Sequence, residues 1–213
     1  MRLTIFGATG GTGVLALRRA LDAGHEVTAV VRDPAGLPSD LRACADVVQA
    51  DVMDPAAIEE AVKGRDAVLS ALGTREGRAP TSVCAEGARS ILTAMAATGA
   101  DRFVLVSASG LHAGPGDDPF TRFVVKPLVL GRLLKHAFAD MRAAEELART
   151  SGLRWTIVRP PRLTNGAGNG RYRKAVDRNV LGGTSIARAD LAIALLDIVD
   201  DPATVEHVIS VSG

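Results

Sequence analysis

Gly7-Ala-Thr-Gly10-Gly-Thr-Gly13 is the stretch that decides the fold of this chain. The run Leu3–Phe6 before it is apolar and β-prone, and residues 12–23 after it have the apolar spacing of an amphipathic helix. A glycine-rich turn between a strand and a helix is the context in which this spacing has chemical meaning. The stretch therefore predicts a phosphate-binding loop.

Each of the three spaced glycines has its own expected task. Gly7 allows the tight turn, Gly10 lets the backbone approach a pyrophosphate, and Gly13 permits close packing of helix on strand. The helix N-terminus presents its free amides to the anion. The other residues of the loop that we expect at the cofactor are Thr9, Gly11 and Thr12. The loop predicts a bound dinucleotide, and the alternative is a purely structural glycine turn.

The end of the second apolar run, Glu26–Val31, indicates which dinucleotide. An NAD-selective protein holds the ribose 2′-hydroxyl there with a carboxylate, but this chain has Arg32. A guanidinium can bind a 2′-phosphate bidentately. The sequence therefore predicts NADP(H), unless Arg32 only pairs with Asp33 or with solvent.

Two further strand ends belong to the same predicted site. Asp51 and Val52 follow the third strand and are expected to frame the adenine. Leu72 and Gly73 follow the fourth strand and would let the backbone pass beside the cofactor, while Arg75 would reach a phosphate. The alternative for each of them is an ordinary strand-end turn.

Short β-branched runs alternate with helical periods along the whole chain. The expected strands are Leu3–Phe6, Glu26–Val31, Asp46–Gln49, Ala67–Ala71, Arg102–Val106, Trp155–Val158 and Val208–Val211, and the expected helices are 12–23, 55–63, 81–98, 137–150 and 188–199. Four of these helices are expected to end at Gly24, Gly64, Gly99 and Gly152. This alternation predicts an α/β Rossmann fold: a doubly wound, mostly parallel sheet in three α/β/α layers.

The length of 213 residues suits a single NAD(P)-binding domain over 1–213. Insertions at 110–135 and 160–183 interrupt the alternation after strand ends, where substrate walls are expected. Within the first insertion, 120–134 is either a packing helix with Pro127 in it or a mobile lid.

Composition excludes several classes of partner and site. The net charge of +1, from 25 basic and 24 acidic residues, gives no field for nucleic acid or an anionic membrane. The N-terminal apolar run is too short for a signal peptide, so we expect a cytoplasmic protein. Cys44 and Cys84 lack metal-ligand spacing, and we interpret both as reduced core thiols with no metal site.

With these motifs in place, the chain resembles a known family over almost its full length. The blocks that carry the resemblance, in family order, are GATGGTG, VRDPAGLP, ADVMDP, ALGTREGRAPTSVCAEGARSI, SGLRWTIVRPPRLT and SIARADLA. They resemble the atypical short-chain dehydrogenases of the NAD(P)H-binding group that includes flavin reductase/biliverdin reductase B, and more distantly the NmrA group. The resemblance implies an NADPH-dependent reductase of planar conjugated acceptors such as flavins.

The chain departs from the short-chain dehydrogenase pattern at the usual proton donor. The Tyr-x-x-x-Lys pair should lie near the start of the helix over 137–150, where this sequence has Ala137 and Met141. Tyr172 is the only tyrosine and lies in an insertion. Ordinary alcohol and ketone chemistry by that dyad is therefore not expected. We interpret Asp140 as a solvated helix carboxylate rather than a group facing the nicotinamide.

The resemblance also suggests which residues face the acceptor. Where the flavin-reductase pattern has a serine and a histidine, this chain has Ser107-Ala108-Ser109 and Pro160-Pro161-Arg162, which puts biliverdin reduction in doubt. Ser107 and Pro160 are expected to contact the cofactor. Ser107 or Ser109 can hydrogen-bond a carbonyl or the nicotinamide, Arg162 can stabilise negative charge, and His112 can donate a proton. The alternatives are backbone capping at a strand end for either serine and a surface ion pair for Arg162.

The leading hypothesis is therefore an NADPH-dependent reductase of a flavin, a quinone-like molecule or another conjugated aromatic acceptor, acting as a monomer or weak homodimer. Hydride transfer to such an acceptor needs no tyrosine, because the ring accepts the charge and solvent can supply the proton. The first alternative is a non-catalytic NADP(H)-binding sensor of NmrA type. The second is a sugar-nucleotide-like epimerase or dehydratase.

Overall fold

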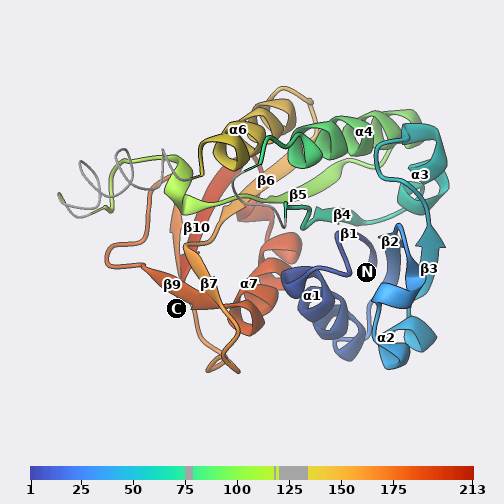
Figure 1. The fold of residues 1–213 in the computed structure, drawn as a ribbon, viewed down its shortest axis with the longest axis horizontal. Helices are drawn as coiled ribbons and strands as arrows, with labels where there is room; N and C mark the ends of the chain where they lie inside the picture. The colour runs from blue at the N-terminus through green and yellow to red at the C-terminus, as the bar shows by residue number, and fades with distance from the viewer. Residues whose placement is uncertain (75–78, 118, 120–133) are drawn as a thin grey trace.

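The computed structural model describes residues 1–74, 79–117, 119 and 134–213. Its centre is an eight-stranded sheet in the order β3-β2-β1-β4-β5-β6-β10-β8 (Figure 1). The bounds of these strands are β1 Arg2–Phe6, β2 Glu26–Val31, β3 Asp46–Gln49, β4 Ala67–Ser70, β5 Arg102–Val106, β6 Arg154–Arg159, β8 Arg173–Val176 and β10 His207–Ser212. Only the pair β10–β8 is antiparallel in this sheet. The mostly parallel sheet is confirmed.

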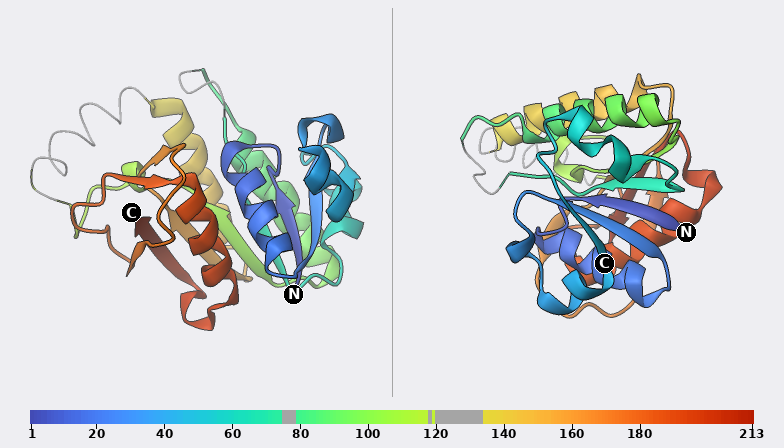
Figure 2. Two further views of the ribbon diagram at one scale, coloured as in Figure 1. Left: turned by 90° about the horizontal axis from the view of Figure 1, so that it is seen from below. Right: turned by 90° about the vertical axis from the view of Figure 1, so that its right-hand side faces the viewer.

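Helices cover both faces of the sheet. Helices α1 (Gly11–Asp22) and α7 (Arg188–Asp200) pack side by side on one face, as the view from below shows (Figure 2). The other face carries α3 (Pro55–Val62), α4 (Val83–Thr98) and α6 (Lys135–Arg149) (Figure 1). The doubly wound α/β class with three layers is thereby confirmed.

The central strands are apolar because both of their faces are covered. In β1, Ile5 packs with the side chains of α1 and α7, while the next residue, Phe6, packs with those of α3 and α4. Both side chains are fully buried. Strands of a parallel sheet that lie between two helical layers form near-continuous hydrophobic runs, as this sequence does.

The order of the strands places a crevice beside β1. The chain moves outward from β1 to β2 and β3, then crosses back to place β4 on the other side of β1. At such a switch point the connections leave the sheet in opposite directions, and ligands of open α/β sheets bind outside the strands' carboxyl ends there. The glycine loop, residues 7–13, begins at this point.

The differences from the predicted elements are confined to short pieces. The sequence did not predict the two-stranded sheet of β7 (Arg162–Thr164) and β9 (Ser185–Ala187), the edge strand β8, or the helix α2 (Ser39–Cys44). A three-residue strand is too short to show alternation, and β8 carries two charged side chains on a sheet edge. Within the described residues there are also short 3₁₀ turns at Pro34–Gly36, Ser109–Leu111 and Pro202–Thr204.

Several smaller predictions meet the structure in different ways. The four glycines expected after helices, Gly24, Gly64, Gly99 and Gly152, all have the positive φ of a helix end. Both cysteines are free, but the interpretation of Cys44 as a core thiol was wrong, because it is exposed while Cys84 is buried. The helix or lid over 120–134 lies outside the described residues apart from Leu134. Among the described helices, none is long and apolar enough to cross a membrane.

Candidate functional site

Glycine is required at two positions of the loop by the backbone that surrounds it. Gly7 has a φ of 78°, and a Cβ there would lie 2.6 Å from the carbonyl oxygen of Ala71, which follows β4. A Cβ on Gly13 would overlap the carbonyl of Gly7. The loop can therefore pass close to β4 and to its own helix only with glycine at these two positions.

The N-terminus of α1 is left open by this turn. Gly10 is the N-cap, with no side-chain cap bond, and the first intrahelical bond runs from Val14 N to Gly10 O at 2.9 Å. The amides of residues 11–13 precede that bond and point out of the helix end. An exposed helix N-terminus with a glycine N-cap is a suitable site for a pyrophosphate.

A cleft of about 230 Å³ lies at the switch point, next to this helix end. It collects the carboxyl ends of β1, β2, β3 and β4 around one space. The predicted cofactor residues that line it are Gly7, Thr9, Gly10, Arg32, Asp51, Val52, Leu72 and Gly73. Gly11, Thr12 and Gly13 form the first turn of α1 beside the cleft, and Arg75 lies outside the described residues.

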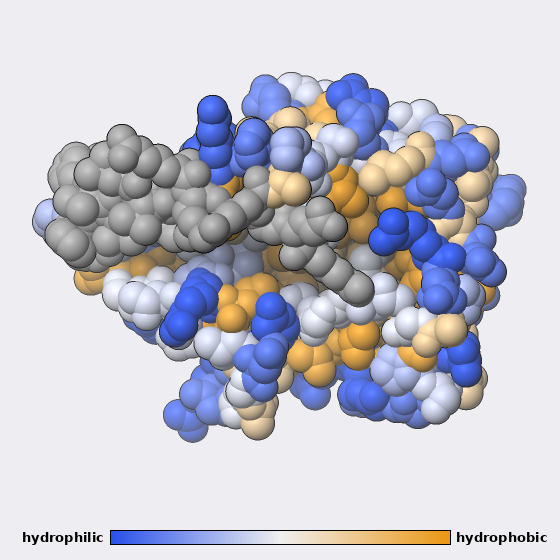
Figure 3. Space-filling model, in the orientation of Figure 1, coloured by the Kyte–Doolittle hydropathy of each residue, from blue (hydrophilic) through white to orange (hydrophobic). Residues whose placement is uncertain are grey.

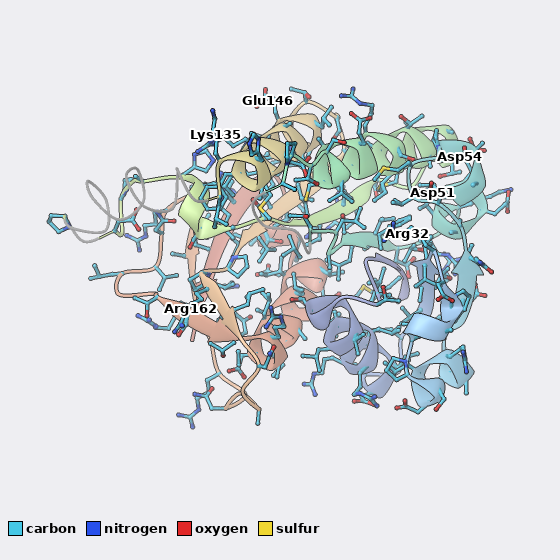
Figure 4. The ribbon with its side chains drawn as sticks, in the orientation of Figure 1. Arg32, Asp51, Asp54, Lys135, Glu146 and Arg162 are labelled. Atoms are coloured by element: carbon cyan, nitrogen blue, oxygen red, sulfur yellow. The ribbon has the colours of Figure 1, made fainter. Side chains whose placement is uncertain are left out.

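The side chain of Arg32 is exposed at the edge of this cleft (Figure 4). The neighbouring Asp33 accepts the amide of Ala35 at 2.9 Å and caps a 3₁₀ turn instead of pairing with Arg32. Gln49 donates to the carbonyl oxygen of Arg32 at 3.2 Å and fixes the backbone. In the part of the chain that the structure describes, no carboxylate pairs with this guanidinium, so its charge faces the cleft.

The opposite wall of the cleft is built by Asp51 and Leu72. Asp51 holds its turn by accepting the amide of Met53 at 3.0 Å. Leu72 lies over α4, where a Cβ on Gly87 would come within 2.5 Å of its Cδ1. Gly87 therefore makes room for Leu72 at the cleft, which explains a glycine in the middle of a buried helix. The polar rim and open backbone of the cleft fit the adenosine and phosphate parts of a dinucleotide.

A second cavity of about 390 Å³ lies at the carboxyl ends of β5, β6 and β10. Its lining is mostly apolar and includes Leu134, Phe138, Pro160, Pro161, Val180 and Val211. The predicted residues Ser109 and Arg162 also line it. Arg162 belongs to β7 of the two-stranded sheet and lies on the opposite side of the view from Arg32 (Figure 4). The space-filling view in the same orientation shows hydrophobic residues between hydrophilic ones (Figure 3).

The two predicted insertions meet at the wall of this cavity. The buried Asn179 donates through Nδ2 to the carbonyl oxygen of His112 at 3.1 Å and to Asp117 Oδ2 at 2.9 Å. The backbone N–H of Asn179 donates to the carbonyl oxygen of Pro115 at 2.8 Å. Gly116, with a φ of 94°, leaves the space that the carbonyl of Asn179 occupies. Asn179 thereby fixes the described part of one insertion on the other.

The four residues predicted to act on the acceptor divide into two pairs. Ser109 and Arg162 line the cavity, whereas Ser107 and His112 do not. Ser107 is buried, and its Oγ donates to Glu145 Oε1 at 2.7 Å. His112 Nε2 lies 3.4 Å from Glu145 Oε2. Ser107 and His112 are therefore held by Glu145, a carboxylate that does not line the cavity.

Glu145 is the functional-site residue that sequence reasoning missed. Its side chain is fully buried, and it accepts from Arg159 Nε at 2.8 Å and from Arg149 at 2.8 Å as well as from Ser107. Burial alone would raise the pKa of Glu145, but the hydrogen bonds from Arg159, His112 and Ser107 outweigh burial and lower it. Glu145 is thus a carboxylate that fixes the end of β5.

The helical period contained a signal for Glu145. The buried face of α6 follows Ala137, Ala144 and Ala148, and Glu145 falls on that same stripe. A charged residue on a buried stripe needs partners of opposite charge. The partners come from β6 and from the next turn of α6, so the stripe predicts burial without identifying them.

The interpretation of Asp140 as a solvated carboxylate was wrong. Asp140 is buried and accepts the amides of Cys84 and Ala85, at 2.9 and 2.8 Å. It therefore caps the N-terminus of α4 from α6, a contact across 56 residues that local sequence cannot show. At the two positions where the sequence predicts the dyad would lie, Ala137 is buried and Met141 packs against the core.

Tyr172, the only tyrosine of the sequence, lies on the side of the sheet that carries α1 and α7. Its hydroxyl donates to Asp197 on α7 at 2.8 Å, and its ring packs against the core on that side of the sheet. Neither cleft has Tyr172 in its lining. The described residues at both clefts thus offer no tyrosine as a proton donor.

Comparison with known proteins gives the class of ligand. The model of the NAD(P)H-binding family matches residues 7–202 of this chain, a range that contains both clefts apart from Phe6, Ser210 and Val211. The chain belongs to the NAD(P)H-binding family. It is 30% identical over 207 residues to the uncharacterized protein YwnB of Bacillus subtilis (strain 168), covering 95% of this chain and 93% of that protein.

Two further relatives extend the comparison. Another protein of the same Bacillus strain, named uncharacterized sugar epimerase YhfK, is 29% identical over 209 residues, covering 96% of this chain and 90% of that protein. A short-chain dehydrogenase/reductase from Veillonella parvula DSM 2008, solved in complex with NADP, superposes with a TM-score of 0.82 at 20% identity, covering 100% of this chain and 94% of that one. This structural likeness shows the shared fold.

Proposed function

We propose that this protein is an NADPH-dependent reductase that transfers hydride to a planar conjugated acceptor such as a flavin or a quinone. The observation that carries the proposal is the pairing of two clefts of opposite character along one sheet edge. Among the described residues, one cleft has a glycine loop and an arginine with no carboxylate partner, and the other is a mostly apolar cavity with one arginine in its lining.

The choice of NADPH rests on Arg32. A guanidinium that has no carboxylate partner among the described residues, at the end of β2, can take a 2′-phosphate as its partner. Gly7, Thr9 and Gly10 would hold the pyrophosphate beside α1, and Asp51 and Val52 would frame the adenine. Since the adenine end is fixed at β2 and β3, the nicotinamide end is directed toward β5 and β6.

The choice of acceptor rests on the shape and lining of the second cavity. A volume of about 390 Å³ with mostly apolar walls suits a flat ring system that is held by few polar groups. When bound, NADPH would supply a hydride, and the walls of the cavity would hold the acceptor next to it. Arg162 stabilises the negative charge that the acceptor gains, Ser109 orients a carbonyl, and solvent supplies the proton.

A stopped-flow assay of NADPH oxidation against FMN, FAD and small quinones tests the proposal. We expect saturable turnover with at least one acceptor, and a raised KM for that acceptor in Arg162→Gln. NADPH binding is measured in parallel by calorimetry. If NADPH binds but no acceptor in the panel is reduced, the reductase proposal fails and a binding protein of sensor type takes its place.

A further inference from the structure

Gly11 is a glycine that the phosphate-loop spacing does not explain. The turn, the phosphate approach and the helix packing are met by Gly7, Gly10 and Gly13. A Cβ on Gly11 would lie 3.1 Å from Nε and 3.2 Å from Cδ of Arg188. The side chain of Arg188 therefore lies directly on the first turn of α1, and Gly11 provides the space for it.

Arg188 is held in this position from two sides. It is the first residue of α7, which packs along α1. Its Nη1 donates to Oδ1 of Asn165, just after β7, at 2.5 Å. Among the described residues no carboxylate pairs with Arg188, whereas Arg18, Arg149 and Arg159 each have one.

The charge of Arg188 is unfavourably placed in the protein alone. The N-terminus of a helix carries a partial positive charge and favours anions, so a guanidinium packed against it is repelled. An anion seated between the amides of residues 11–13 and the guanidinium removes that repulsion and gains a charge-assisted hydrogen bond. The arrangement is thus completed by a negative ligand at the glycine loop.

We infer that Arg188 binds the pyrophosphate of the dinucleotide from the α7 side of the loop, opposite to Arg32. The inference rests on the dinucleotide binding of the family and is independent of the reductase proposal. Under this inference, each of the two arginines binds a different phosphate group of the dinucleotide. Arg32 serves the 2′-phosphate, which only NADP(H) carries, and Arg188 serves the pyrophosphate, which NADP(H) and NAD(H) share.

Calorimetric titration of NADPH and NADH into Arg188→Gln and Arg32→Ala tests this division. We expect Arg188→Gln to weaken both dinucleotides by the same factor of about ten, because one charge-assisted contact is lost in each. Arg32→Ala is expected to weaken NADPH alone. The matched control is Arg171→Gln, at an exposed arginine of the insertion 160–183, which is expected to change neither affinity.

Two further variants separate a binding role from a role in folding. Arg188→Lys keeps the charge but loses the planar fork and is expected to weaken both dinucleotides less than Arg188→Gln does. Gly11→Ala leaves Arg188 intact and pushes its side chain away by a few tenths of an ångström, so a small, equal loss is expected. The melting temperature of each variant is measured alongside.

Unchanged affinity of Arg188→Gln for both dinucleotides would overturn the inference, and so would a loss confined to NADPH. If Arg188→Gln does not fold, unchanged affinity in Gly11→Ala and Arg188→Lys overturns it equally. Failure of the reductase proposal has a different signature, since it leaves these affinities as expected and removes only acceptor turnover.

Discussion

The two clefts of this protein lie on one edge of one sheet and are built by different means. The proposed cofactor cleft is made largely of backbone: glycines at a strand–helix turn, helix amides, and strand ends with the exposed Arg32. The proposed acceptor cavity is made of side chains from two insertions, joined by Asn179 and backed by the buried Glu145. The cofactor cleft depends on few contacts between residues that are distant in sequence, whereas the acceptor cavity is built from such contacts.

This difference predicts where each cleft is sensitive to substitution. A site that depends on backbone shape is damaged by adding a single carbon atom. A site that depends on buried polar contacts is damaged by removing a charge at a distance from the ligand. The following substitutions are arranged from the largest expected effect to the smallest.

Replacing Gly7 by alanine should have the largest effect. The new Cβ would lie 2.6 Å from the carbonyl oxygen of Ala71 at a φ of 78°, so backbone strain and steric overlap add together. We expect a loss of about 4 kcal/mol of unfolding free energy and more than 100-fold weaker NADPH binding. Denaturant unfolding and calorimetry measure the two effects.

The control for Gly7→Ala is Gly24→Ala. Gly24 has a similar φ of 77°, but a Cβ there meets nothing within 4 Å. Only strain remains, so a loss of about 1 kcal/mol and unchanged NADPH affinity are expected. Equal losses in the two variants would show that close approach to β4 does not matter.

Replacing Glu145 by glutamine should have the next largest effect, although Glu145 does not line the proposed cofactor cleft. Arg159 and Arg149 lose the buried negative charge that they share, which costs about 3 kcal/mol. For a chain of this size the melting temperature should fall by roughly 6–12 °C. The neighbouring Glu146→Gln, on an exposed side chain, should change it little (Figure 4).

The effect of Glu145 should also depend on pH. Its pKa in the folded protein lies below the ordinary carboxyl value of 4.5, so the unfolded state binds the proton more tightly. The stabilisation is present above that value and is lost as pH falls below it. The difference in melting temperature between wild type and Glu145→Gln should therefore shrink as pH is lowered from 7 toward about 3. A difference that does not change with pH would contradict this account.

Replacing Asp140 by asparagine should have the smallest effect of the three. Asp140 caps α4 through two amides while buried, and Asp54 caps α3 through the amides of Ala56 and Ala57 while exposed. We expect a loss of about 1–2 kcal/mol for Asp140→Asn and a smaller loss for Asp54→Asn, because water can replace the exposed cap. Chemical denaturation of the two variants makes the comparison, and a larger loss at Asp54 would reverse it.

The difference between a cleft built from backbone and a cavity built from side chains explains how far the sequence predicted the site. Gly7–Gly13, Arg32, Asp51 and Leu72 could be grouped from sequence because strand ends of a parallel sheet converge at one edge. Glu145 and Asp140 could not be understood in this way. Apart from Arg149, which lies one helical turn from Glu145, their partners lie 14 to 56 residues away, and nothing in the spacing identifies those partners. The short strands β7 and β9 were missed because three residues show no periodicity.

The most direct test of the two-cleft account is a cross-comparison of Arg32→Ala and Arg162→Gln. For each variant, the affinity for NADPH and the KM of an oxidised acceptor that the wild type reduces are measured on the same preparation. The account predicts that Arg32→Ala weakens NADPH binding by about 10- to 100-fold and leaves the acceptor KM at saturating NADPH unchanged. It predicts the reverse for Arg162→Gln. Parallel changes of both quantities in both variants would contradict the separation of cofactor and acceptor into two clefts.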